Sequence, residues 1–248
     1  MTNIIKRIGV VTGRVLNQLR RDHRFVGISL VFPLVIIYFI KVVFDALASP
    51  SFNVSVYVVP YAAFIIHFIT FILTAIVLVR ERTAGTLARM FVSGYNPIEI
   101  VSGYLLAYTV LATVQSLLVL IELNWIFELG YDLGQLASIY LVMWVLAIVS
   151  MAIGMLVSNF ARNEGQVFPF IPLVLLSVIL SGIILPIERL PEWVQALSFL
   201  TPLYYVNEVI QKLIIGDGLF DDWPKLIGLL AYGLIIVSTA TLSLRESD

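Results

Sequence analysis

Six long apolar stretches, separated by short connections, take up most of this sequence. Each is close to the roughly 20 residues that a helix needs to cross a hydrocarbon layer of about 30 Å. Because a segment in lipid must satisfy its own backbone polar groups, these stretches are predicted to be α-helices. The predicted fold is an all-α membrane protein with six transmembrane helices in a single domain, residues 1–248. The stretches run from Phe25 to Leu47, Tyr57 to Val79, Val101 to Leu123, Gln135 to Val157, Val167 to Leu185 and Leu226 to Leu244.

The composition supports this interpretation and excludes several classes of function. Of the 248 residues, 60% are hydrophobic and 12% are charged, whereas a soluble domain is usually about a quarter charged. The net charge of −1 gives no electrostatic case for binding nucleic acid. The chain has no cysteine, and it contains no phosphate-binding loop, zinc-protease motif or serine-hydrolase motif. We therefore expect no catalytic residue, no metal site and no cofactor bound by this chain itself.

Basic residues are shared unevenly between the connections. If all six stretches cross, the more basic connections lie on one side of the membrane. The positive-inside rule then places that side, with both termini, in the cytoplasm. The basic residues on that side are Lys6, Arg7, Arg14, Arg20, Arg21, Arg24, Arg80, Arg82, Arg89, Arg162 and Arg245. Those on the other side are Lys41, Arg189, Lys212 and Lys225.

Residues 1–24 are predicted to form an amphipathic elbow helix at the membrane surface. Apolar residues recur at intervals of three and four and share one helical stripe, and the basic residues lie largely off it. A helix of this kind lies in the membrane plane with its cationic groups near anionic headgroups. Two roles are open: the helix only anchors the first span, or it also touches a cytoplasmic partner. The stripe consists of Ile4, Ile8, Val11, Val15 and Leu19.

The segment 80–97, between the second and third stretches, is predicted to hold a short cytoplasmic helix. Leu87, Met90 and Phe91 share one face of this helix, and Gly94 is placed to end it. An apolar face outside both lipid and core is expected to bind a partner. A plain interfacial helix is the alternative.

The segment 186–215, between the fifth and sixth stretches, is apolar but broken by prolines. Pro191 and Pro202 each suit the first turn of a helix. The pieces that follow them are too short to cross the bilayer. Short apolar helices bounded by prolines indicate re-entrant or interfacial elements.

Two helix starts carry capping signals. Asn96, Pro97 and Glu99 suit the N-cap, the first position and the capping box of the third spanning helix. Thr201 suits the N-cap before Pro202.

These segments resemble the permeases of the ABC-2 type transporter family. Directly after the second of the six spans, Glu81 is followed by Gly85 and Thr86. This arrangement is similar to the family pattern, in which a Gly-Thr step follows an acidic residue after a few positions. The steps Leu190-Pro191-Glu192-Trp193 and Pro202-Leu203-Tyr204-Tyr205 also look like this family. The resemblance implies that segment 80–97 is a coupling helix that inserts into a cleft of an ATP-binding subunit. The residues it assigns to this contact are Glu81, Gly85, Thr86, Leu87, Met90 and Phe91.

The same resemblance implies an ATP-driven exporter in a prokaryotic cell membrane. It implies two ATP-binding subunits, which bind ATP and Mg²⁺, and a second permease chain, identical or closely related. The third to sixth stretches hold almost no ionisable residue near their middles, where proton- or sodium-driven carriers commonly place carboxylates. The short outer connections favour an amphipathic or hydrophobic substrate: a drug, a lipid or a lipid-linked glycan. The alternatives are a stand-alone channel or secondary carrier, and a permease-like assembly component.

Five residues within the spans are candidates for lining a substrate path. A polar side chain at mid-membrane depth is a functional candidate, and aromatic side chains could line a path for an apolar substrate. Each also has a structural alternative, as a side chain hydrogen-bonded or packed between helices. The five are His67, Phe64, Phe68, Phe71 and Gln115.

Small residues four positions apart predict two close helix contacts. Gly103 with Ala107, and Ser150 with Gly154, have the small-xxx-small spacing that lets two backbones approach in a membrane.

Overall fold

The computed structural model describes residues 2–47 and 54–244. Within those ranges the chain forms helices and connections and has no strand, which confirms the all-α prediction. Arg245 and most of the predicted outer connection 48–56 lie outside the described residues. In chain order the elements are α1 (Thr2–Arg21), α2 (His23–Leu47), α3 (Ser55–Thr83), α4 (Thr86–Val92), α5 (Pro97–Ile126), α6 (Leu133–Ser158), the 3₁₀ helix η1 (Glu164–Phe170), α7 (Ile171–Leu180), the 3₁₀ helix η2 (Ile187–Arg189), α8 (Glu192–Ser198), α9 (Pro202–Ile214) and α10 (Trp223–Ser243).

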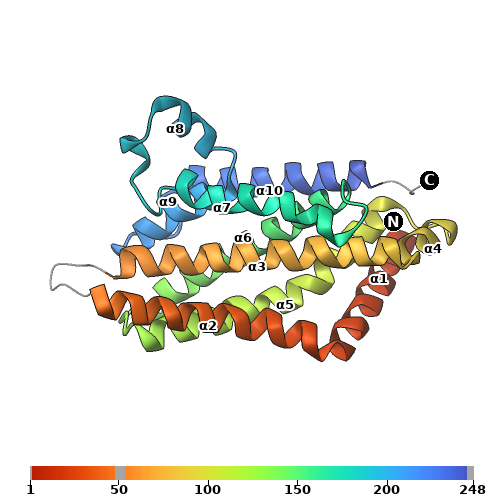
Figure 1. Cartoon of the computed structure of the whole chain (residues 1–248), viewed down its shortest axis with the longest axis horizontal. Helices are drawn as coiled ribbons and strands as arrows, with labels where there is room; N and C mark the ends of the chain where they lie inside the picture. Colours follow the sequence, from red (N-terminus) through yellow and green to blue (C-terminus); the bar gives the residue numbers. More distant parts are fainter. Residues whose placement is uncertain (1, 48–53, 245–248) are drawn as a thin grey trace.

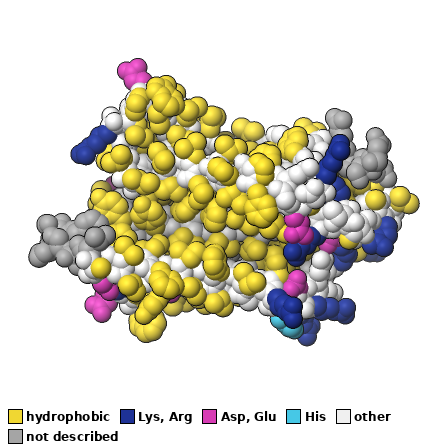
Figure 2. Space-filling model, viewed as in Figure 1, with side chains coloured by type: hydrophobic (Ala, Val, Ile, Leu, Met, Phe, Trp, Pro, Cys, Tyr) yellow, Lys and Arg dark blue, Asp and Glu magenta, His cyan; other side chains and the backbone are white. Residues whose placement is uncertain are grey.

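Among the described residues, five helices are long and apolar enough to cross a membrane: α2, α3, α5, α6 and α10. They run roughly along the long axis of the molecule (Figure 1). Figure 2 shows a broad band of hydrophobic side chains across the middle, with Lys and Arg gathered at the end where α1 and α4 lie. The chain is therefore a multi-pass membrane protein, because an apolar belt between charged ends matches the layers of a bilayer. We call the end with α1 and α4 the basic end.

The fifth apolar stretch folds differently from the predicted helix. The sequence predicts a helix over Val167–Leu185, whereas η1 and α7 together cover Glu164–Leu180. Pro169 and Pro172 disfavour regular α-helix here because each lacks the backbone N–H that a continuing turn needs. Gly182 follows the end of α7 with a φ of +82°, a left-handed conformation that glycine adopts without strain. This segment is consequently shorter than its neighbours and begins as a 3₁₀ helix.

α3 and α6 form the most extensive helix pair among the described residues. Gly154 lets the two helices approach, because a Cβ on it would lie 2.6 Å from the carbonyl oxygen of Phe71 and 3.0 Å from the backbone nitrogen of Ala75. One turn before Gly154, the Oγ of Ser150 lies 2.6 Å from Nδ1 of His67. The Ser150 hydroxyl itself donates to a backbone carbonyl of α6. The predicted close contact at Ser150 and Gly154 is confirmed.

Between α7 and α10 the chain forms η2 and then two short α-helices, which follow Pro191 and Thr201 as predicted and differ in burial. α9 packs against α3, α6 and α10, with Leu203 and Val206 buried. α8 projects from the bundle, away from the basic end, and Trp193 in it is exposed (Figure 1). Asn207 of α9 donates through Nδ2 to the carbonyl of Ser181 at 2.9 Å and so satisfies the C-terminal end of α7.

The helix ends follow the local sequence signals. Asn96 and Glu99 form the capping box of α5, with Pro97 in its first turn. Thr201 accepts a hydrogen bond from a backbone N–H in the first turn of α9. Gly94 has a φ of +79° directly after α4. These ends define α4 as a separate helix between two long ones.

Candidate functional site

The amphipathic helix α1 is docked on α5. Val11 occupies the place that a side chain would take at Gly103, because a Cβ there would lie 2.5 Å from Val11. The hydroxyl of Thr12 donates to the carbonyl of Gly103 at 3.2 Å. Val11 and Val15 are buried, so much of the predicted apolar stripe faces protein. The predicted close contact at Gly103 is therefore confirmed, and α1 is fixed to the bundle.

Arg14 joins α1 to the end of α3 and to α4. Its Nη2 donates to Oε2 of Glu81 at 2.6 Å, and its Nη1 lies 3.1 Å from Sδ of Met90. The Glu81 side chain is 6% exposed and that of Arg14 is 36% exposed. Burial acts to lower the pKa of Arg14, but its interactions with Tyr104 and with the Glu81 carboxylate outweigh this effect and raise the pKa. The charged pair therefore holds three helices together at one point.

A second arginine of α1 reaches the turn between α4 and α5. Arg7 donates through Nη1 to the carbonyl of Gly94 and lies 3.5 Å from Oε2 of Glu99. Its guanidinium also stands over the ring of Tyr95, with 5.6 Å to the ring centroid. Arg7 of α1 thus holds the turn after α4, and Arg14 of α1 holds Met90 of α4 and the end of α3.

Two arginines of α3 tie its end to the end of α6 and to η1. Arg82 donates through Nη1 to the carbonyls of Ser158 and Ala161, at 2.6 and 2.8 Å. Arg80 donates through Nε to Oε1 of Glu164 at 2.8 Å, and both of these side chains are exposed. From the sequence, these arginines indicate only which side of the membrane this connection lies on. Their partners are mostly backbone carbonyls far away in the chain, which no local pattern reveals.

The structure corrects the predicted exposure of α4. The face that carries Leu87, Met90 and Phe91 points into the protein: Leu87 is 2% exposed, Met90 is 8% exposed and Phe91 packs against the same core. The predicted exposure is wrong for Leu87 and Met90 because α3 and Arg14 of α1 cover that face. These apolar side chains hold α4 in place.

The outward face of α4 is formed by other residues. Arg89, Val92 and Ser93 are exposed, and Val92 is 82% exposed. Gly85 precedes the helix with a φ of +67°, and the Thr86 hydroxyl accepts a hydrogen bond from Nη2 of Arg89 at 3.2 Å. The surface that a partner at the basic end can reach is therefore a short, partly basic ridge.

The five candidates for a substrate path differ in burial. His67, Phe71 and Gln115 lie in the interior of the chain. Phe64 and Phe68 are only partly buried, with ring centroids 5.8 Å apart. Four of the five share α3, and Gln115 lies on α5. A path along them stays a prediction, and the two partly exposed phenylalanines are the residues best placed to line it.

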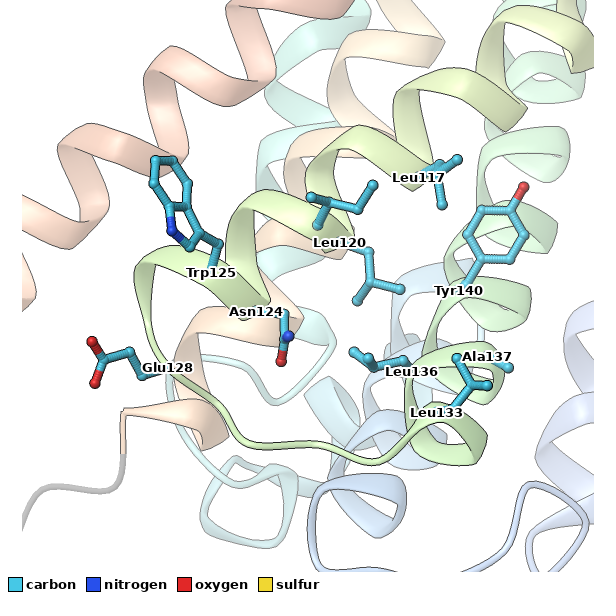
Figure 3. A pocket seen from close by; sticks show the side chains of 10 residues that line it. Leu117, Leu120, Asn124, Trp125, Glu128, Leu133, Leu136, Ala137 and Tyr140 are labelled. Carbon is cyan, nitrogen blue, oxygen red and sulfur yellow. The ribbon is translucent and has the colours of Figure 1, made fainter.

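A cleft of about 830 Å³ lies between the ends of α5 and α6 that are remote from α1 (Figure 3). Leu117 and Leu120 of α5 stand across it from Leu136 and Tyr140 of α6. Asn124 points into the space between the two helices, and its Oδ1 has no hydrogen-bond partner among the described residues. Sequence reasoning missed this cleft because its walls come from two helices whose packing no local pattern gives.

Several arginines at the basic end join helices. In residues 2–47 and 54–244, no group of three or more His, Asp or Glu side chains could hold a metal ion. The arginines described above are paired with carboxylates or with backbone carbonyls. These contacts connect α4 and the ends of α3 and α5 to α1 and to the end of α6.

The sequence matches proteins of known class over most of its length. The model of the "ABC-2 type transporter" family matches residues 6–215. The "Probable multidrug ABC transporter permease YbhR" of Escherichia coli is 26% identical over 186 residues, which cover 72% of this chain and 50% of that protein. The "Linearmycin resistance permease protein LnrN" of Bacillus subtilis is 24% identical over 68% of this chain and 44% of its own length. The "ABC transporter G family member 20" of Dictyostelium discoideum is 26% identical over 71% of this chain and 24% of its own length. The chain thus spans half the length, or less, of these relatives.

Proposed function

Because the chain belongs to the ABC-2 type transporter family, whose model covers residues 6–215, we propose that it is the membrane-spanning permease subunit of an ATP-driven exporter. Two ATP-binding subunits, which carry ATP and Mg²⁺, dock at the basic end. A second permease chain, identical or closely related, completes the path. The chain itself is a non-catalytic transport subunit in a prokaryotic cell membrane.

The arginine-braced position of α4 is the observation that carries this proposal. α4 stands at the basic end and is attached to α1 by Arg14 and Arg7, and to α3 by a chain segment of only two residues. A helix held this firmly moves with its neighbours as one body, because packed interfaces do not deform continuously. Closure of a partner against the outward face of α4 is therefore transmitted to α3 and α5. Leu87 and Met90 support the helix from inside, and Arg89 and Val92 make the contact.

We propose that the substrate is amphipathic or hydrophobic, a drug, a lipid or a lipid-linked glycan. The names of two relatives, which refer to multidrug transport and to linearmycin resistance, support this class. Phe64 and Phe68 line the path, which forms between the two permease chains. The test is the ATPase rate of the reconstituted complex: hydrophobic drugs or lipids raise it, and stimulation by small polar solutes alone would contradict the proposal.

Replacing Val92 by aspartate is expected to weaken the contact with the ATP-binding subunit. Val92 is 82% exposed, so the substitution leaves the permease fold intact while it puts a charge into the proposed interface. We expect the ATP-binding subunit to copurify at least about tenfold less, since truncation or charge at a central interface position commonly costs about 2 kcal/mol. Quantitative immunoblotting of affinity-purified complexes measures this.

Two variants make this experiment specific. Val92→Ile keeps the apolar contact and should copurify normally. Leu133→Asp changes an equally exposed leucine at the start of α6 and should also leave the complex intact. Normal copurification of the Val92→Asp variant would contradict docking at the outward face of α4.

We also propose that the segment Glu164–Leu180 crosses the membrane, which gives six crossings. Seven residues of 3₁₀ helix at about 2.0 Å each and ten of α-helix at about 1.5 Å each extend roughly 29 Å, close to the ~30 Å hydrocarbon thickness. The 3₁₀ turns thus lengthen a segment that would be too short as α-helix alone.

Cysteine labelling tests this topology directly, because the chain contains no cysteine. With six crossings, a single cysteine at Glu188 reacts with a membrane-impermeant maleimide from outside the cell, and one at Ser93 does not. Both positions are exposed. Equal protection of both positions would indicate that Glu164–Leu180 does not cross.

A further inference from the structure

The corner between α1 and α2 creates a groove on α5. α1 crosses α5 where Val11 meets Gly103, and the chain then turns at Asp22 into α2. α2 returns to α5 through Phe25, whose ring lies 6.2 Å from that of Tyr108, edge to face. Figure 1 shows the angle at which the two helices meet. Because the two helices diverge from their common corner, a space remains between them above α5.

The floor and walls of this groove are apolar. Its volume is about 270 Å³. Ala107 lies at its base and is fully buried, and this small side chain leaves room above it. The walls are Leu16 and Leu19 of α1, Val26 and Leu30 of α2, and Val110, Leu111 and Val114 of α5. Val110 and Val114 are exposed and belong to the apolar surface of α5.

The rim of the groove is cationic. Arg20 and His23 line it at the corner, and both are exposed. Arg21 and Arg24 lie next to them in the chain and are also exposed. Among the described residues, the side chains of Arg20 and His23 take part in no ion pair, unlike Arg7 and Arg14 on the same helix. The rim therefore presents the guanidinium of Arg20 and the imidazole of His23 as hydrogen-bond donors; the carboxylate of Asp22 at the same corner accepts from the backbone N–H of Phe25.

We propose that this groove binds one anionic phospholipid of the leaflet at the basic end. The phosphate lies between Arg20 and His23, and one acyl chain lies over Ala107 between α1, α2 and α5. Charge complementarity supports an anionic lipid over a zwitterionic one, because each basic residue near a membrane surface strengthens the binding of anionic lipid about fivefold. The bound lipid packs under the corner where α1 meets α2.

The test is native mass spectrometry of the full chain, purified in detergent and titrated with phosphatidylglycerol or with phosphatidylcholine of the same acyl chains. The wild-type chain should bind phosphatidylglycerol more tightly. Arg20→Gln should weaken that binding about fivefold, the effect expected for one basic residue, and Arg20→Lys should largely restore it. Lys6→Gln removes an exposed cation from the same helix outside the groove and should leave binding unchanged.

A second pair of variants tests the apolar part of the groove. Val110→Trp fills the space above Ala107 and should weaken the binding of both lipids. Leu234→Trp makes the same kind of change at an exposed position of α10, outside the groove, and should not. Equal binding of the two lipids by the wild-type chain, or equal losses for Arg20→Gln and Lys6→Gln, would overturn the proposal. The readout needs no ATP-binding subunit, so its failure leaves the proposed export function untouched.

Discussion

Gly154→Ala is expected to destabilise the chain by about 3 kcal/mol, because the added methyl group meets backbone atoms that cannot rotate away. A Cβ at this position lies 2.6 Å from the carbonyl oxygen of Phe71 and 3.0 Å from the backbone nitrogen of Ala75. The helices α3 and α6 must separate to admit it. Separation would also stretch the contact between His67 and Ser150, one turn away. For a chain of this size, such a loss corresponds to a fall in Tm of about 6 to 12 °C.

The measurement is fluorescence-detected size-exclusion chromatography after heating, with Gly27→Ala as the matched control. Gly27 also lies in a long apolar helix, α2, but nothing stands within 4 Å of the position of its Cβ. Alanine there should be neutral or slightly stabilising, because it lowers the backbone entropy of the unfolded chain. Equal Tm values for the two variants would show that α3 and α6 are not in backbone contact at Gly154.

Arg14→Gln is expected to disable coupling and to cost about 2 kcal/mol of stability. The substitution leaves the Glu81 carboxylate, whose side chain is 6% exposed, without its cationic partner. Breaking a buried pair costs about 3 to 5 kcal/mol, and the 36% exposure of Arg14 reduces that figure. Because the same guanidinium contacts Met90, α4 also loses one of its attachments to α1, and the contact of Arg7 with Gly94 remains. Drug-stimulated ATPase activity should therefore fall more than the amount of folded protein does.

The exposed pair between Arg80 and Glu164 is the matched control for this experiment. It joins the same end of α3 to η1, but its side chains are 56% and 47% exposed. Arg80→Gln should change stability by no more than about 1 kcal/mol. In addition, the double variant Arg14→Glu with Glu81→Arg should recover part of the loss, since it restores opposite charges. A similar ATPase loss for Arg14→Gln and Arg80→Gln would contradict a specific role for the buried pair.

Features set by local sequence could be predicted, because the residues that decide them are neighbours. The spanning helices α2, α3, α5, α6 and α10 follow from apolar length alone. The capping box of Asn96 and Glu99 and the left-handed Gly94 follow from residues within one turn. The contact at Gly154 could be anticipated from Ser150 four positions earlier, but its partner helix could not.

Features that depend on how distant helices pack could not be predicted. Leu87 and Met90 form an apolar stripe whether that stripe faces a partner or the chain's own core, and the positions of α1 and α3 decide between the two. The 3₁₀ start of the fifth apolar stretch depends on Pro169 and on the η1 contacts with α3. Similarly, the groove under Arg20 exists because α1 and α2 meet at an angle that periodicity does not encode.

The acceptors used by the arginines at the basic end have a consequence for how this region tolerates change over evolution. Arg7 and Arg82 donate to main-chain oxygens of Gly94, Ser158 and Ala161, which every amino acid supplies. A substitution at one of those acceptor positions leaves the carbonyl oxygen in place. Selection for these hydrogen bonds therefore does not constrain the side chain of the acceptor residue. Among homologues, we therefore expect Arg82, whose acceptors are backbone oxygens, to be invariant without any covarying partner. Methods that infer contacts from correlated substitutions would then miss the bonds that hold the end of α3 to α6.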